Sequence, residues 1–268
     1  MSQHAARARD AARQAGDDDR LETVARIGYA TNGVVHLLLA WIAVQVAWTG
    51  GGEDADQSGA MALLAKNAFG KGLLWLCVLG FAGLAVWQVT EAVRGGSGQG
   101  SDQAKARAKA AGKAVVYAAL GVSAARFAVG SGSSSKQQST SLTGRLLEAP
   151  GGQVLVALVG LGVLAVGAYH VVKGVRKKFL DDLRGHPGRT VERLAVAGYV
   201  AKGVALGVLG VLFVVAAVQH DPKEAGGLDA ALKTLREQPS GPVLLTLVGL
   251  GIAAYGLYSF ARSRYARL

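Results

Sequence analysis

The stretch GYATNGV at residues 28–34 returns as GYVAKGV at residues 198–204. A weaker copy, KAVVY at residues 113–117, lies between them and aligns with residues 32–36. A second set of segments recurs in matching places, and its members are LGF at 79–81, LGV at 161–163 and LGI at 250–252. Self-similarity at a regular interval is typical of a chain built from repeated supersecondary units. The sequence therefore predicts three copies of one two-helix unit.

Apolar residues gather in six runs that are long enough to cross a bilayer. A hydrocarbon core of about 30 Å needs roughly 20 residues of helix, and lipid leaves no partner for unpaired peptide groups, so each run should be helical. We expect an all-α integral membrane protein with six transmembrane helices, arranged as three tandem repeats with pseudo-threefold symmetry. The runs are 27–48, 72–93, 114–130, 154–172, 194–218 and 243–260.

The repeats predict the boundaries along the chain. Residues 24–94 form the first two-helix repeat, residues 107–178 the second and residues 191–264 the third. Residues 1–22 are rich in Ala, Arg and Asp, which favours a disordered cytoplasmic tail. A helix lying on the membrane surface is the alternative for this tail.

The net charge of +11 indicates a membrane topology rather than a nucleic-acid partner. The basic residues are unevenly distributed among the segments that connect the apolar runs. Twenty of the 29 Lys and Arg residues lie in the two tails and in the second and fourth connections, whereas seven lie in the other three connections. By the positive-inside rule, we expect a multi-pass protein of the cell membrane with both termini in the cytoplasm.

Glycine marks the expected contacts between helices. Small residues spaced four apart allow helix backbones to approach closely in lipid, and a role as hinges is the alternative. The glycines predicted to pack helices together are Gly33, Gly80, Gly162, Gly203, Gly207 and Gly251.

Three polar residues fall at equivalent positions of the first helix of each repeat: Asn32, Lys113 and Lys202. Polar groups within spans are costly and are often functional, so a threefold arrangement would bring two ammonium groups and one amide toward one site. The alternative for both lysines is that the long side chain reaches back to the cytoplasmic surface. We expect that behaviour for Lys113 and leave both possibilities open for Lys202.

His36 and Arg126 complete the set of candidate substrate-binding residues. His36 follows Asn32 by four residues and therefore lies on the same helix face. It is either a hydrogen-bonded packing residue or part of a proton relay. Arg126 lies near the outer end of its run, where it either points to the interface or forms a constriction that favours anions.

No motif for catalysis, metal binding or a cofactor is present in the sequence. The sequence has no phosphate-binding loop, no nucleophile elbow and no His or carboxylate groups at metal-ligand spacing. The single cysteine, Cys77, excludes an intrachain disulfide. We therefore expect no enzymatic activity and no cofactor.

The motifs RIGYATNGVVH at 26–36 and RLAVAGYVAKGV at 193–204, with the glycines of the second helices, resemble a bacterial membrane family known as domain of unknown function 1206. The resemblance extends over about residues 24–265 and implies three two-helix units. It implies no activity and no site residues. The middle repeat departs from the pattern, because Lys109 and Ala110 stand where the other repeats have Gly and Tyr.

Two functions are compatible with these features. The first is a small transport or channel-like protein for anions, since the polar residues within the spans carry more positive than negative charge. The second is a non-catalytic scaffold that binds anionic lipid or a protein partner through its basic cytoplasmic rim. A homo-oligomer or an unknown membrane partner is possible in either case. The predicted lipid-binding residues of this rim are Lys173, Arg176, Lys177 and Lys178.

Overall fold

A computed structural model describes residues 19–94 and 101–266 of the chain. The predicted tail therefore lies almost entirely outside the described residues. Within the described ranges the chain is helical, with one isolated bridge between Leu183 and Ala266 and no strand. The long helices are α2 (Asp19–Thr49), α4 (Ala68–Arg94), α5 (Ser101–Ala128), α7 (Gly152–Val175), α8 (Arg189–Gln219) and α10 (Gly241–Tyr265).

Shorter elements connect the long helices. The first long helix of each repeat leads into a short helix: α3 (Gln57–Ala65), α6 (Ser135–Glu148) or α9 (Gly227–Glu237). α6 contacts α9, and both α3 and α9 contact α2. The three short helices cover one end of the molecule, which we call the capped end. The start of α2 and the end of α10 lie side by side at the opposite end. Arg26 of α2 joins them by donating hydrogen bonds to the carbonyl oxygens of Ser263 and Arg264. We call this the basic end. The 3-10 turns η1 (Lys178–Asp182) and η2 (Pro222–Ala225) complete the described chain.

Five helices are long and apolar enough to cross a membrane: Ala25–Thr49, Ala68–Val93, Gly152–Val175, Arg189–Gln219 and Gly241–Tyr265. The sequence predicts six. The sixth apolar run does form a helix, α5, but its first half carries four basic residues, which lowers its mean hydropathy. Those residues are Lys105, Arg107, Lys109 and Lys113. The structure therefore supports a multi-pass membrane protein with five candidate spans.

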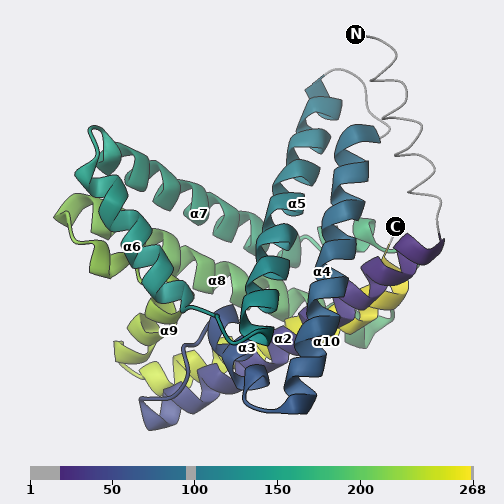
Figure 1. Cartoon of the computed structure of the whole chain (residues 1–268), viewed down its shortest axis with the longest axis horizontal. Helices are drawn as coiled ribbons and strands as arrows, with labels where there is room; N and C mark the ends of the chain where they lie inside the picture. The colour runs from purple at the N-terminus through teal and green to yellow at the C-terminus, as the bar shows by residue number, and fades with distance from the viewer. Residues whose placement is uncertain (1–18, 95–100, 267–268) are drawn as a thin grey trace.

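The long helices pair across the repeats rather than within them. α4 packs most extensively on α5, α7 on α8, and α10 on α2, so the second helix of each repeat contacts the first helix of the next in cyclic order. Within the first and third repeats the two long helices also pack, α2 on α4 and α8 on α10. Within the middle repeat, α5 and α7 hardly touch. Figure 1 shows α5 and α7 running in different directions, with α6 crossing between them. The ring of helices is therefore open on this side.

Glycine decides how closely the helices approach. A Cβ added at Gly80 would lie 2.7 Å from the Cα of Gly28, where α4 crosses α2. A Cβ at Gly33 would lie 2.9 Å from the carbonyl oxygen of Gly256 on α10. Real Cβ atoms do not approach backbone this closely, so these crossings require residues without a side chain.

The other predicted packing glycines differ in their surroundings. A Cβ at Gly203 would lie 2.7 Å from the carbonyl oxygen of Gly167, and one at Gly251 would collide with the Cβ of Ala201. Gly207 has room for a Cβ of its own, although it faces Gly167 across the same crossing of α7 and α8. Gly162 has no atom within 4 Å of an added Cβ, so the structure does not place it at a helix crossing.

The Gly80→Ala variant tests the α2–α4 crossing. The new methyl group would force two backbones apart, and overpacking of this kind costs about 1–3 kcal/mol of stability. We expect the thermal unfolding midpoint of the detergent-purified protein to fall by roughly 5 °C. The sole cysteine, Cys77, is buried, so its reaction with a fluorogenic maleimide during heating reports unfolding.

The matched control is Gly162→Ala, which adds the same methyl group where no atom lies within 4 Å. Its midpoint should equal that of the parent protein. Equal midpoints for both variants would contradict the account of the crossing.

Candidate functional site

A lysine and a histidine from different repeats meet near the middle of the molecule. The Nζ of Lys202 on α8 lies 3.2 Å from the Nε2 of His36 on α2. The other ring nitrogen of His36, Nδ1, lies 2.8 Å from the carbonyl oxygen of Asn32. A carbonyl oxygen only accepts, so Nδ1 carries the proton and Nε2 accepts from the lysine. The geometry therefore fixes a neutral His36 that orients the Lys202 ammonium group.

Aromatic and polar groups of α10 complete this pair. The Lys202 ammonium lies 4.4 Å from the centre of the Tyr255 ring, which is a cation–π distance, and the rings of His36 and Tyr255 are 4.9 Å apart. The Nδ2 of Asn32 donates to the Oγ of Ser259 at 3.3 Å. Among the residues that the structure describes, no carboxylate forms an ion pair with Lys202. The described residues therefore supply no negative charge that pairs with the ammonium group of Lys202.

A cavity of about 220 Å³ opens next to this pair. Along each helix the lining residues lie toward the capped end of the pair, as Leu39 does beyond His36 and Leu206 beyond Lys202. The wall is apolar except at its two ends. Lys202 and His36 form the floor, and Asp56, Gln57 and Ser135 lie at the roof. The remaining lining residues are Ala205, Leu209, Leu228 and Ile252.

On the other side of the pair, toward the basic end, aromatic rings fill the interior. Tyr199 contacts Tyr255 at 5.3 Å between ring centres, and Phe179 of η1 stacks on Tyr199 at 5.6 Å. Phe179 and Tyr258 are fully buried. We call these four rings the aromatic plug. It separates the cavity from the basic end.

An ion pair holds η1 over the aromatic plug. The Nζ of Lys173 lies 2.5 Å from the Oδ2 of Asp182. Burial by itself would raise the pKa of Asp182, but the charges of Lys173 and Arg262 outweigh burial and lower it. The ionised pair therefore fixes the turn that carries Phe179.

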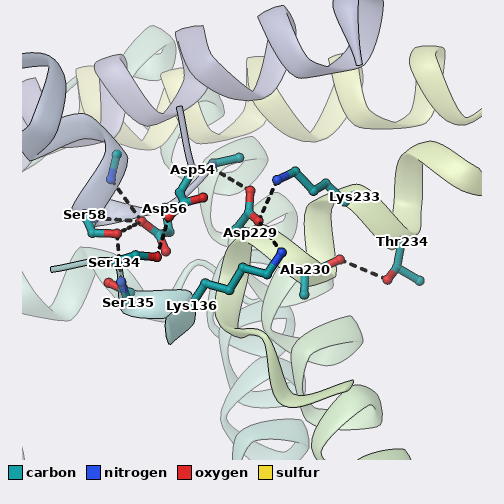
Figure 2. Close-up of polar contacts among 12 residues, drawn as sticks. Asp54, Asp56, Ser58, Ser134, Ser135, Lys136, Asp229, Ala230, Lys233 and Thr234 are labelled. Atoms are coloured by element: carbon teal, nitrogen blue, oxygen red, sulfur yellow. Dashed lines mark hydrogen bonds and ion pairs between the residues drawn. The ribbon is translucent and has the colours of Figure 1, made fainter. Parts of the chain in front are cut away.

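The roof of the cavity belongs to a polar cluster that joins all three repeats (Figure 2). Asp229 of α9 is fully buried, and it accepts a hydrogen bond from the amide of Ala55 at 2.9 Å. Its Oδ2 lies 2.8 Å from the Nζ of Lys233 and 3.8 Å from the Nζ of Lys136. One carboxylate therefore ties the connection of the first repeat to α6 and α9.

Asp56 forms the second part of this cluster. It caps the N-terminus of α3, because its Oδ1 accepts from the amides of Ser58 and Gly59. The hydroxyl of Ser58 in turn accepts from the amide of Ser135 at 3.0 Å. Asp56 is 1% exposed, and its Oδ2 has no hydrogen-bond partner among the described residues. Burial raises the pKa of this carboxyl group.

The structure brings together three of the five predicted substrate-binding residues. Asn32, His36 and Lys202 form one connected site. Lys113 is exposed on α5 and does not join them, although it aligns with Asn32 and Lys202 in the repeats. Arg126 is also exposed, in the last turn of α5 toward the capped end.

The predicted rim residues divide into two kinds. Lys173 is 9% exposed and pairs with Asp182, so its charge is already compensated. Arg176, Lys177 and Lys178 are exposed. Lys177 pairs with Glu192 at 2.5 Å and lines a surface hollow of about 620 Å³ at the basic end. The other residues of this hollow are Arg189, Glu192, Arg193, Val196 and Ala197.

Four residues of the site were missed by sequence reasoning: Tyr255, Asp56, Gln57 and Ser135. Tyr255 precedes Ser259 by four residues and therefore shares its helix face, which is a signal the sequence did contain. The roof residues had no such signal, because they reach the cavity only through contacts between distant connections. Groups of three or more His, Cys, Asp or Glu that could hold a metal are absent from the described residues.

The Asp229→Ala variant tests the polar cluster. Removal of this carboxylate leaves the amide of Ala55 and two lysines without their partner, and breaking a buried pair costs about 3 kcal/mol or more. We expect a clear fall in the thermal unfolding midpoint. The control, Asp181→Ala, removes an exposed carboxylate and should change stability by less than about 0.5 kcal/mol. A variant of Asp229 as stable as this control would show that the cluster does not hold the capped end.

Comparison with known proteins gives the family of this chain. The family model described as Domain of Unknown Function (DUF1206) matches the chain three times, at residues 27–95, 108–177 and 197–266. The chain is also 28% identical over 250 residues to the Uncharacterized protein YxxB of Bacillus subtilis (strain 168), across 91% of this chain and 90% of that protein. No solved structure matches the chain. The three matches fall on the three two-helix units, which confirms the resemblance noted in the sequence: the chain belongs to the family described as Domain of Unknown Function (DUF1206).

Proposed function

We propose that this protein binds small anions in the cavity above Lys202 and moves them across a bilayer. The observation that carries the proposal is the placement of an ammonium group on a cavity of about 220 Å³ without a carboxylate among the described residues to pair with it. His36 and Tyr255 orient this ammonium group, but neither supplies a negative charge.

The cost of an unpaired charge supports this assignment. A cation inside a low-dielectric region costs several kcal/mol unless a counter-charge compensates it. Lys202 lies near the middle of α8, one of the candidate spans, so its side chain is far from both helix ends. An anion in the cavity would compensate the ammonium group. The Lys202 side chain would then act as a binding site rather than as an anchor at the membrane surface.

The cavity walls set the size of the bound anion. A volume of about 220 Å³ is below the 300–1,000 Å³ that is typical of sites for drug-sized ligands. The aromatic plug closes the side toward the basic end. Release of an anion on that side would therefore require the rings to move, which is the alternating access that a transporter needs.

The proposal includes an arrangement in the membrane. α5 serves as the sixth span beside the five candidate spans, and the three repeats are related by a pseudo-threefold axis along the membrane normal. The protein lies in the cell membrane with its basic end facing the cytoplasm, so both termini lie in the cytoplasm. The excess of Lys and Arg in the tails and in the second and fourth connections supports this orientation. No chemical conversion forms part of the proposed function.

The Lys202→Met variant tests the anion site. Methionine keeps much of the side-chain length and removes the charge, so packing changes little while the binding group is lost. We expect the flux of chloride or acetate into proteoliposomes to fall at least tenfold, which corresponds to about 1.4 kcal/mol. The measurement uses an anion-sensitive dye trapped in the lumen.

The control for this prediction is Lys178→Met, which removes an exposed charge of the basic end. Flux through the control should match the parent protein. Anion flux that persists unchanged in the Lys202 variant would refute the proposal.

A second candidate function rests on the hollow at the basic end. Three cations, Lys177, Arg189 and Arg193, surround Glu192 beside the apolar side chains of Val196 and Ala197. Such a combination suits an anionic lipid, since its headgroup would meet the cations and its chains would meet the apolar residues. In this alternative the protein is a membrane scaffold that holds anionic lipid or a partner and passes no solute.

The double variant Arg189→Gln/Arg193→Gln tests this alternative. Each surface cation contributes about 1 kcal/mol to attraction by anionic lipid, so retention of phosphatidylglycerol through purification should fall about fivefold per charge. Native mass spectrometry counts the lipids that stay bound. Lys223→Gln, at the capped end, serves as the control. Equal retention in both proteins would exclude the hollow as a lipid site.

A further inference from the structure

A second hollow lies on the open side of the ring, where α5 and α7 hardly touch. Its volume is about 520 Å³, and it runs along α5 beside the start of α6. Val116 and Val122 on its wall are 56% and 58% exposed, so this face of α5 would be open to the bilayer. We call this hollow the lateral groove. Its polar members are Gln57, Ser123, Arg126, Ser133, Ser135 and Gln138.

The lateral groove and the cavity share two residues. Gln57 and Ser135 line both spaces, so these two side chains form the boundary between them. The backbone around this boundary is fixed, because the amide of Ser135 donates to Ser58 and the hydroxyl of Ser134 donates to Asp54 at 2.5 Å. No hydrogen bond from another described residue holds the side chain of Gln57. The boundary thus combines a hydrogen-bonded backbone with a side chain, that of Gln57, which no hydrogen bond from a described residue holds.

The two spaces have the same chemical character. The wall of the cavity is mainly aliphatic, and the lateral groove combines four aliphatic residues of α5 with its six polar ones. Each space contains one cation with no carboxylate partner among the described residues. That cation is Arg126 in the lateral groove and Lys202 in the cavity. A ligand that passes through both spaces would meet a positive charge in each and would bury aliphatic carbon in the cavity. At the roof it would also meet the carboxyl group of Asp56, whose pKa is raised by burial, which favours its neutral form. Chloride and other fully hydrated ions gain nothing from such walls, whereas an anion with a short aliphatic chain gains from every methylene that it buries.

We propose that the natural ligand is a single-chain amphipathic carboxylate that enters from the bilayer through the lateral groove and passes Gln57 and Ser135 to reach Lys202. Arg126 attracts the headgroup at the start of this route. This inference rests on the proposed function, since it names the ligand class of the same site.

The experiment compares the binding of radiolabelled octanoate and acetate to the full chain in nanodiscs, with empty nanodiscs subtracted. Each fully buried methylene strengthens binding roughly fourfold, so octanoate should bind at least tenfold more tightly than acetate even if only part of the chain is buried. Lys202→Met should abolish the binding of both compounds.

Two further variants test the route. Ser135→Trp should slow the exchange of bound octanoate at least tenfold, because the indole would fill the boundary. Arg126→Gln should slow octanoate association at least threefold and leave acetate affinity unchanged. Arg145→Gln, which removes an exposed cation of α6 outside the lateral groove, should change neither quantity.

The outcomes separate this inference from the proposed function. If Lys202→Met abolishes acetate binding but octanoate binds no more tightly than acetate, the anion site stands and the amphipathic ligand is refuted. If octanoate exchange is unchanged by Ser135→Trp, the lateral route is refuted. If neither compound binds the parent protein above empty nanodiscs, both proposals fail.

Discussion

The arrangement of this protein depends on the close approach of helix backbones at pairs of glycines. Where α2 crosses α4, Gly28 faces Gly80, and where α2 crosses α10, Gly33 faces Gly256. Where α7 crosses α8, Gly167 faces Gly203. Lipid provides no hydrophobic force between helices, so van der Waals contact over such crossings supplies much of the association. The α2–α10 and α7–α8 crossings each place the second helix of one repeat on the first helix of another, whereas the α2–α4 crossing joins the two long helices of the first repeat.

Divergence of the repeats turns this common plan into an asymmetric site. Equivalent positions carry Asn32, Lys113 and Lys202, but only the first and third repeats pack their own two long helices together. In the middle repeat α5 and α7 separate, and Lys113 stays on the surface of α5. The lateral groove lies along the same helix, beside the start of α6 and next to the cavity. The middle repeat thus leaves its cation, Lys113, outside the site that Lys202 forms.

Charge is distributed in layers from one end of the molecule to the other. The basic end carries exposed cations and the Lys173–Asp182 pair, and the aromatic plug follows it. Lys202 and His36 form the floor of the cavity, and the buried carboxylates Asp56 and Asp229 form or support its roof. The ammonium group of Lys202 lies between the aromatic plug and the carboxyl groups of the roof, and the cavity adjoins it on the side of the roof. That asymmetry is the basis for the proposal that an anion occupies the site.

The sequence by itself determined the all-helical repeat architecture, because run length and glycine spacing are local properties that lipid imposes on each segment. It also identified Asn32, His36 and Lys202, since polar residues within apolar runs stand out without any knowledge of contacts. Only the tertiary structure decided which of these residues meet. The prediction that Lys113 lies beside Lys202 required a closed ring of helices. The ring is open between α5 and α7, so the two lysines do not meet. The roof was equally hidden, because Asp229 reaches the amide of Ala55 across 174 residues of chain, and no local pattern encodes a contact of that range.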